Sequence, residues 1–213
     1  MRIVIAGGHG KIALLLSSLL ATEGHHPVGM IRNAGHAAEV RATGAEPLVL
    51  DLESSDVSAV ATALAGADAV VFAAGAGPDS GAARKLTVDR DGAILLAAAA
   101  EEAGVPRIVV ISSIGADDFD PLSDDVMQVY LRAKSEADAA VRATQLDWTI
   151  VRPGTLTDEP GTGRITVGET VDGGTIPRAD VAAVVAALVT EGRALRRQFE
   201  LVSGDAAIAD ALG

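Results

Sequence analysis

The sequence contains no cysteine and few aromatic residues, with one Trp, one Tyr and three Phe among 213 residues. Without cysteine, the chain can form neither a disulfide framework nor a thiol-based catalytic or metal site. The four histidines lie near the N-terminus and lack the spacing of a metal site, so we expect no structural metal. The scarcity of aromatic residues also draws attention to the single tyrosine, Tyr130.

Basic residues and long apolar runs are scarce too. The chain has 17 Lys and Arg residues and 29 Asp and Glu residues, which gives a formal net charge of −12. Nucleic-acid binding requires a basic surface, so we expect no nucleic-acid partner. The apolar stretch Ala93–Ala100 is far shorter than the roughly 20 residues that cross a bilayer, and the first apolar segment begins too early for a secretory signal. We expect a cytoplasmic protein with no membrane contact, either a monomer or a homodimer.

Apolar runs alternate with helical patterns along the whole chain, and its length suits one domain. Strands separated by helices in this way form parallel sheets with helices on both faces. We therefore predict one α/β domain over residues 1–213 with a doubly wound, mostly parallel sheet. Residues 155–177 are expected to be irregular apart from a short strand at Arg164–Val167, and to contribute to a small substrate pocket. The other expected strands are Arg2–Ala6, Pro27–Ile31, Pro47–Leu50, Ala69–Ala74, Arg107–Ser112, Trp148–Val151 and Gln198–Val202. The expected helices are Lys11–Glu23, Ala34–Thr43, Asp56–Ala65, Ala82–Ala103, Asp124–Thr144 and Arg178–Glu191.

A glycine-rich turn follows the first expected strand. Gly7, Gly10 and Ala13 form a G-x-x-G-x-x-A pattern. Gly7 permits a tight turn, Gly10 lets the backbone approach a pyrophosphate, and Ala13 lets the helix pack closely on the strand. Free N–H groups at the helix start, at Lys11 and Ile12, would hold the phosphates with help from the helix dipole. Between a strand and a helix, the pattern favours a dinucleotide-binding Rossmann fold over an ordinary turn.

The end of the second expected strand indicates which dinucleotide binds. Sites for NAD(H) usually place Asp or Glu there to bind the adenosine ribose hydroxyls. This sequence has Ile31-Arg32-Asn33 instead, and Arg32 could neutralise a 2′-phosphate. We therefore expect NADP(H) in preference to NAD(H). The simpler alternative is that Arg32 is a solvated surface arginine.

Tyr130 and Lys134 are candidates for catalysis. They lie four residues apart on an expected helix, so both side chains can face one cleft. Hydride transfer to a carbonyl leaves charge on oxygen, so a positioned proton donor helps, and a nearby ammonium favours the phenolate form of a tyrosine. Lys134 could supply this ammonium and also bind the nicotinamide ribose hydroxyls of the cofactor. Ser113, at the end of the fifth expected strand, would bind the substrate oxygen, and its neighbour Ser112 is the second choice. The alternative is a buried tyrosine with a surface lysine one turn later.

The sequence resembles the short-chain dehydrogenase/reductase superfamily. Within it, the chain is similar to the atypical NAD(P)-binding branch that includes NmrA-like proteins, flavin and biliverdin reductases, and small NADH-flavin reductases. The resemblance implies that Asp51 and Leu52 border the adenine. It also implies that Ala73, Ala74 and Gly75 line the ribose side of the cofactor, and that Pro153, Gly154 and Thr155 flank the nicotinamide and the substrate pocket. The stretches that carry it are Ala6–Ala13, Ile31-Arg32, Val49–Leu52, Phe72–Gly75, Val110–Asp117, Tyr130–Lys134 and Trp148–Leu156.

Three functions are compatible with these patterns. The first is an NADP(H)-dependent oxidoreductase that reduces a small carbonyl, quinone or flavin-like acceptor, with Tyr130, Lys134 and Ser113 as catalytic residues. The second is an NADP(H)-binding redox sensor of the NmrA type without catalysis, although a sensor has no need of these three residues together. The third is a nucleotide-sugar epimerase or dehydratase. Such enzymes build a large C-terminal lobe, and only some 60 residues follow Pro153 here, so this function is the least favoured.

Overall fold

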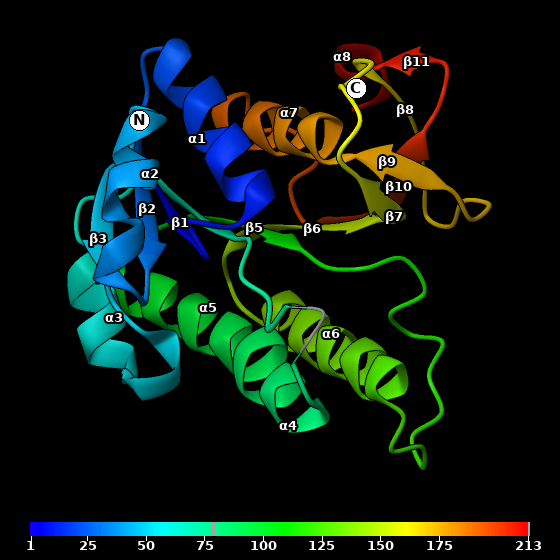
Figure 1. Cartoon of the computed structure of the whole chain (residues 1–213), viewed down its shortest axis with the longest axis horizontal. Coiled ribbons are helices and arrows are strands. Elements are labelled where there is room, and N and C mark those ends of the chain that lie inside the picture. The colour runs from blue at the N-terminus through cyan, green and yellow to red at the C-terminus, as the bar shows by residue number, and fades with distance from the viewer. Residues whose placement is uncertain (78–79, 213) are drawn as a thin grey trace.

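A computed structural model describes residues 1–77 and 80–212, which form a nine-stranded sheet with helices on both faces (Figure 1). The strand order is β11-β8-β10-β6-β5-β4-β1-β2-β3, and the strands from β10 to β3 are parallel. The central order 3-2-1-4-5-6 is that of a doubly wound nucleotide-binding sheet, which confirms the predicted fold class. The strands are β1 (Arg2–Ala6), β2 (His26–Ile31), β3 (Glu46–Val49), β4 (Ala69–Phe72), β5 (Arg107–Ile111), β6 (Asp147–Pro153), β8 (Arg164–Gly168), β10 (Arg197–Ser203) and β11 (Ala206–Ala207).

The central strands of the sheet are buried between two helical layers, and both of their faces are largely apolar. On β1, Ile3 and Ile5 pack in the core cluster that includes α1 (Lys11–Thr22) and α7 (Arg178–Thr190). Val4 and Ala6 pack in the cluster that includes α3 (Val57–Leu64), α5 (Gly92–Ala103) and α6 (Val126–Arg142). Successive side chains along the strand point to opposite faces of the sheet, so one strand contributes to two hydrophobic cores. The helices are α1 (Lys11–Thr22), α2 (Ala37–Ala42), α3 (Val57–Leu64), α4 (Ala82–Arg84), α5 (Gly92–Ala103), α6 (Val126–Arg142), α7 (Arg178–Thr190) and α8 (Ile208–Ala211).

The long helix expected at Ala82–Ala103 is interrupted. The single turn α4 leads into a π-helical segment, η3 (Lys85–Asp91), and only then into α5. Gly92 begins α5 against Phe72, where an added Cβ would lie 3.5 Å from the ring. The wide π turn buries Lys85 and Asp89, and π segments of this kind occur often at functional sites.

Residues 155–177 are more regular than expected. Besides β8, they contain β7 (Thr155–Thr157) and β9 (Thr175–Pro177), which pair in parallel as a second, two-stranded sheet.

The helix expected at Asp124–Thr144 starts later than expected. Asp125 caps α6 by accepting hydrogen bonds from the N–H groups of Met127 and Gln128, so α6 begins at Val126. Within the described residues, no helix is long and apolar enough to cross a membrane.

Candidate functional site

The turn between β1 and α1 brings backbone close to backbone. Gly7 has a φ of +81°, and a Cβ at this position would lie 2.6 Å from the Cα of Ala74, which follows β4. Gly10 is the N-cap of α1 and offers no side-chain cap, so the first N–H groups of the helix are left for another acceptor. A turn that only glycine fits, with open amides at a helix start, suits a phosphate group.

A cavity of about 280 Å³ opens at this turn. Its wall runs along the carboxyl ends of β1, β2 and β4, the position at which doubly wound sheets bind nucleotides. The wall contains eight residues that the sequence analysis assigned to the cofactor, namely Gly7, Gly10, Arg32, Asp51, Leu52, Ala73, Ala74 and Gly75.

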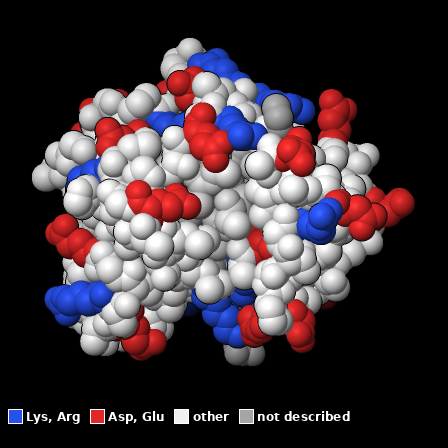
Figure 2. All heavy atoms as spheres, turned by 90° about the horizontal axis from the view of Figure 1, so that it is seen from above, with Lys and Arg blue, Asp and Glu red and all other residues white. Residues whose placement is uncertain are grey.

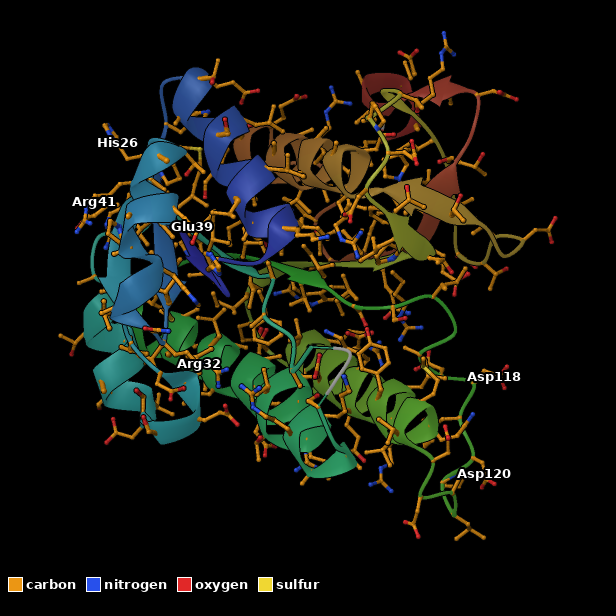
Figure 3. All side chains as sticks on the ribbon, in the orientation of Figure 1. His26, Arg32, Glu39, Arg41, Asp118 and Asp120 are labelled. Carbon is orange, nitrogen blue, oxygen red and sulfur yellow. The ribbon has the colours of Figure 1, made fainter. Side chains whose placement is uncertain are left out.

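Glu53 and Arg84, which the sequence analysis missed, lie with Arg32 at the β2 and β3 end of this cavity. The Glu53 carboxylate lies 2.9 Å from Arg84 Nη2 and 3.5 Å from Arg32 Nη1, and it accepts a hydrogen bond of 2.7 Å from Thr87. The hydrogen bond from Arg84 is the main cause that lowers the pKa of Glu53. Arg32 follows β2 and lies across the molecule from the acidic loop that carries Asp118 (Figure 3). Two arginines thus already hold one anion at the cavity wall.

Two histidines complete the wall at the same end. The rings of His9 and His36 are stacked, with centroids 3.7 Å apart, and His9 Nε2 lies 3.1 Å from a carboxylate oxygen of Glu39. His9 belongs to the glycine-rich turn, and His36 to the short 3₁₀ turn η1 (Ala34–His36) after β2. The rings therefore connect the turn to the segment that carries Arg32.

A second cavity, of about 590 Å³, contains Tyr130, Lys134 and Ser112. It shares Ala73, Ala74 and Gly75 with the first cavity, so a single wall leads from the glycine-rich turn to the tyrosine. The same cavity is lined by Ile12, Gly77, Lys85, Asp89, Ile111, Val126, Met127 and Leu156.

Lys134 is fixed on the wall of the second cavity. Its ammonium group donates a hydrogen bond of 3.1 Å to the carbonyl oxygen of Ile111 and lies 3.6 Å from the carboxylate of Asp89. It also lies 5.9 Å from the centre of the Tyr130 ring. Asp89 is itself oriented by the N–H of Ala76, at 3.1 Å. The lysine predicted from its spacing thus has a rigid position beside the tyrosine.

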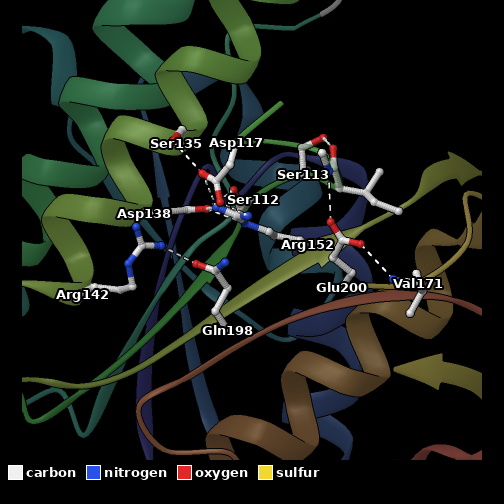
Figure 4. Close-up of polar contacts among 12 residues, drawn as sticks. Ser112, Ser113, Asp117, Ser135, Asp138, Arg142, Arg152, Val171, Gln198 and Glu200 are labelled. Atoms are coloured by element: carbon white, nitrogen blue, oxygen red, sulfur yellow. Dashed lines mark hydrogen bonds and ion pairs between the residues drawn. The ribbon is translucent and has the colours of Figure 1, made fainter. Parts of the chain in front are cut away.

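A buried polar network lies behind this wall (Figure 4). The Ser112 hydroxyl donates a hydrogen bond of 2.8 Å to Asp138, and Arg152 binds the same carboxylate oxygen through Nε at 2.9 Å. Arg152 also forms a bidentate pair with Asp117, at 2.7 and 3.0 Å, in the loop after β5. The network joins β5, β6 and α6, and so fixes where Ser112 enters the cavity.

The titration of this network follows from burial and charge. Burial raises the pKa of Asp138, against the opposing effects of Arg152 and Ser112. Hydrogen bonds from Arg152 lower the pKa of Asp117 to about 2. For Arg152, burial acts to lower the pKa, but the contacts with Asp117 and Asp138 outweigh it and raise the pKa. The arginine is therefore the charge that compensates both carboxylates.

Glu200 holds the loops after β5 and β8 through its carboxylate. One of its carboxylate oxygens accepts the N–H of Gly115 at 3.2 Å, and the other accepts the N–H of Val171 at 3.0 Å (Figure 4). Glu200 lies on β10 and is buried, so it ties the loop after β5 and the loop after β8 to the sheet.

Several predicted site residues lie off the walls of both cavities. The Lys11 ammonium is paired with Asp158 at the surface, and Ser113 donates a hydrogen bond of 3.2 Å to the Ile114 carbonyl. Pro153, Gly154 and Thr155 use their backbone in the sheets: Pro153 ends β6, Gly154 donates to Leu201 and Thr155 to Gly174. Of the two serines, it is Ser112 that reaches a cavity wall.

Acidic and basic side chains are interspersed on the face seen in Figure 2. Both cavities contain basic and acidic side chains: Arg32 and Arg84 line the first together with Asp51 and Glu53, and Lys85 and Lys134 line the second together with Asp89. The charged groups of the second cavity therefore carry one net positive charge in a chain whose net charge is −12. A positive cavity favours an anionic small molecule as its ligand.

Comparison with known proteins gives one consistent result. A profile described as NAD(P)H-binding matches residues 7–192. A Bacillus subtilis (strain 168) protein called uncharacterized sugar epimerase YhfK is 36% identical, over 100% of this chain and 99% of that protein. A solved structure from Bacillus halodurans, described as a candidate NAD-dependent epimerase/dehydratase, is 39% identical with a TM-score of 0.91, over 100% of this chain and 98% of that one. The oxidoreductase ylbE from Lactococcus lactis is 30% identical with a TM-score of 0.86, over 100% of this chain and 95% of that one. The resemblance found in the sequence is confirmed, and the chain belongs to the NAD(P)H-binding family.

Proposed function

We propose that the chain is an NAD(P)H-dependent reductase of a small carbonyl, quinone or flavin-like acceptor, and that it prefers NADPH to NADH. The observation that carries the proposal is the wall formed by Ala73–Gly75, which borders both cavities. A dinucleotide with its phosphates at the Gly7–Gly10 turn would extend along this wall toward Tyr130 and Lys134. Cofactor and acceptor would then meet at the carboxyl ends of the strands.

The residues of the second cavity suit the proton half of a reduction. When bound, a nicotinamide coenzyme supplies a hydride to the acceptor carbon. The electron pair of the carbonyl bond then moves to oxygen, which takes a proton from Tyr130 and becomes a hydroxyl group. Solvent then returns the proton to Tyr130, and the Lys134 ammonium lies 5.9 Å from the centre of its ring.

The serine assignment stays a proposal. Ser113 was expected to bind the substrate oxygen, but it is Ser112 that lines the cavity, and the Ser112 hydroxyl donates a hydrogen bond to Asp138. Comparison of Ser113→Ala with Ser112→Ala, in the assay below, tests which serine the acceptor contacts.

The direct test is reduction of a quinone, a flavin and an aldehyde series with NADPH and with NADH. We expect NADPH-dependent turnover of at least one acceptor, with a kcat/KM above that found with NADH. If NADPH binds tightly and no acceptor is reduced, the sensor alternative replaces the enzyme.

Gly7→Ala should damage cofactor binding. The new Cβ would displace Ala74 from the shared wall, and the alanine would have to adopt the left-handed backbone conformation of Gly7. We therefore expect the Kd for NADPH to rise at least about tenfold. Gly24→Ala is the matched control, because Gly24 also has a φ of +81° but has nothing within 4 Å of its Cβ position. The control should lose about 1–2 kcal/mol of unfolding free energy and keep its affinity for NADPH. Equal affinities in the two variants would refute the role of the turn.

Arg32→Ala should remove the preference for NADPH. A charged hydrogen bond to a phosphate contributes about 1.5–3 kcal/mol, so the Kd for NADPH should rise by about 10–100-fold, and the Kd for NADH by less than about twofold. Glu53→Gln is the opposing control, since it removes the carboxylate that competes for Arg32 and Arg84 and should tighten NADPH binding. Fluorescence titration measures both constants. An equal loss for both cofactors would contradict the assignment of Arg32 to the 2′-phosphate.

The names of two relatives raise epimerase activity as a second candidate. A nucleotide-sugar site needs a sizeable lobe beyond the sheet, and the residues after Pro153 are largely used by β8, β10 and α7 together with the small β7–β9 sheet. Turnover of UDP-glucose without net consumption of NAD(P)H would favour the epimerase over the reductase.

A further inference from the structure

A second lysine lies next to Tyr130. Lys85 begins the π-helical segment η3 and is only 7% exposed. Its ammonium group lies 5.4 Å from the centre of the Tyr130 ring, so the tyrosine has an ammonium within 6 Å in Lys85 as well as in Lys134. The sequence analysis gave Lys85 no role, because it placed this residue on an ordinary helix.

The two lysines differ in their partners. Lys134 is paired with the buried carboxylate of Asp89 and also donates to the Ile111 carbonyl. Lys85 donates a hydrogen bond of 2.7 Å to the Gly77 carbonyl, and none of the carboxylates in residues 1–77 and 80–212 lies within 4.0 Å of it. Among the charged groups that line the second cavity, the ammonium groups of Lys85 and Lys134 therefore face the single carboxylate of Asp89.

A buried ammonium with an incomplete set of partners is costly. Lysine has three donors, and the Gly77 carbonyl takes one of them. A carboxylate or phosphate would supply the further acceptors and the negative charge that Lys85 lacks among residues 1–77 and 80–212. An excess positive charge in the cavity therefore selects for an anionic ligand.

The anionic group belongs to the acceptor rather than to the dinucleotide. Lys85 lines the second cavity and is not on the wall of the first, where Gly7, Gly10 and Arg32 lie. Its neighbours on the second wall include Val126, Met127 and Leu156. A largely apolar wall with one net positive charge suits an organic acceptor that carries one anionic substituent.

We propose that Lys85 binds an anionic group of the acceptor, so that the natural substrate is a carbonyl or flavin-like compound with a carboxylate or phosphate. The inference rests on the proposed reductase function. It adds that the cavity selects the charge of the acceptor through Lys85, independently of the proton donated by Tyr130.

The test uses two pairs of acceptors, each of which differs in one anionic group. FMN and riboflavin differ by a phosphate, and phenylglyoxylate and its methyl ester differ by a carboxylate charge. Values of kcat/KM are measured with NADPH for the parent chain, Lys85→Met and Lys85→Arg. Methionine keeps the linear stem without the charge, and arginine restores the charge.

We expect the parent chain to prefer the charged member of at least one pair. Lys85→Met should lower kcat/KM for that member at least about tenfold, mainly through KM, and leave the neutral member within about threefold. Lys85→Arg should recover most of the loss. The affected pair distinguishes a phosphate from a carboxylate, and the Kd for NADPH should be the same in all three proteins.

Three results would overturn the proposal. Equal losses for charged and neutral acceptors would make Lys85 structural or a partner of Tyr130, and a raised Kd for NADPH with unchanged charge preference would assign it to the cofactor. A parent chain without charge preference would also contradict it. If no acceptor is reduced, the proposed reductase function is wrong, and the role of Lys85 is tested separately. Calorimetry then measures the binding of FMN and of riboflavin to the complex with NADP⁺, and Lys85→Met must abolish any preference for FMN. A parent chain that binds neither flavin, or binds both equally, counts against the proposal.

Discussion

Tyr130→Phe should lower kcat for the best acceptor by about 10²–10⁴-fold, the range found for loss of a positioned general acid. The variant removes one oxygen and keeps the ring, which lies 5.4 Å from the Lys85 ammonium and 5.9 Å from that of Lys134. The packing of both lysines should therefore survive. The Kd for NADPH should change by less than about twofold, because Tyr130 lines the second cavity and not the first.

Lys134→Met is the informative companion to this variant. It removes an ammonium that is held by Asp89 and by the Ile111 carbonyl, so it leaves the Asp89 carboxylate without its cation. We expect a loss of kcat together with a loss of stability, whereas Tyr130→Phe should lose kcat alone. Stopped-flow measurement of NADPH oxidation separates the chemical step from product release. If Tyr130→Phe keeps the parent rate of that step, the proton comes from another group.

The sheet could be predicted from the sequence because its signals are local. Most of the parallel strands contain a short apolar run, and β1 shows why: Ile3 and Ile5 face one core, and Val4 and Ala6 the other. The turn at Gly7 and the pair of Tyr130 and Lys134 were predictable for the same reason. Their spacings of three or four residues fix which groups share a surface, and the structure places Gly7 on the wall of the first cavity and Tyr130 and Lys134 on that of the second.

The rest of the site depends on contacts between distant segments. Lys85 and Asp89 come to the cavity through a π-helical turn, and an alanine-rich helical pattern gives no sign of such a turn. Arg84 and Glu53 meet although 31 residues separate them, so neither residue type nor local spacing indicated a shared role. Gly154 was assigned to the cofactor by resemblance, but its N–H is used by Leu201 on the neighbouring strand.

The buried network behind Ser112 predicts the largest effect on stability. Arg152→Met should lower the free energy of unfolding by about 3–5 kcal/mol, the usual cost of removing one partner from a buried ion pair. Asp138 has no exposed surface, and its second carboxylate oxygen has no hydrogen-bond partner among the described residues. Without Arg152, an ionised Asp138 would keep only the Ser112 hydroxyl and the more distant Lys134 charge.

The control variants separate the two carboxylates that Arg152 binds. Asp117→Asn should cost much less than Arg152→Met, because the Asp117 side chain is 56% exposed and water can replace its partner. The double variant Arg152→Met with Asp138→Asn should recover a large part of the loss, since it removes the uncompensated charge. Urea unfolding at pH 7.5 gives all of these values. A double variant no more stable than Arg152→Met would show that lost packing, and not charge, is the cause.

The pH dependence of the Arg152→Met deficit tests the same cause independently. Burial already raises the pKa of Asp138, and loss of the arginine should raise it further. A carboxyl whose pKa is higher in the folded state destabilises the fold only where the unfolded chain would ionise, above about pH 4, and the penalty grows up to the folded-state pKa. The deficit of the variant should therefore shrink between pH 7.5 and pH 5. Asp117 cannot produce this change, because the stability that it gains from a pKa of about 2 is fully present at pH 5 and is lost only below about pH 4. A deficit that stays constant from pH 7.5 to pH 5 would mean that loss of Arg152 does not change the protonation of Asp138 in this range, so that lost packing or hydrogen bonds cause the deficit.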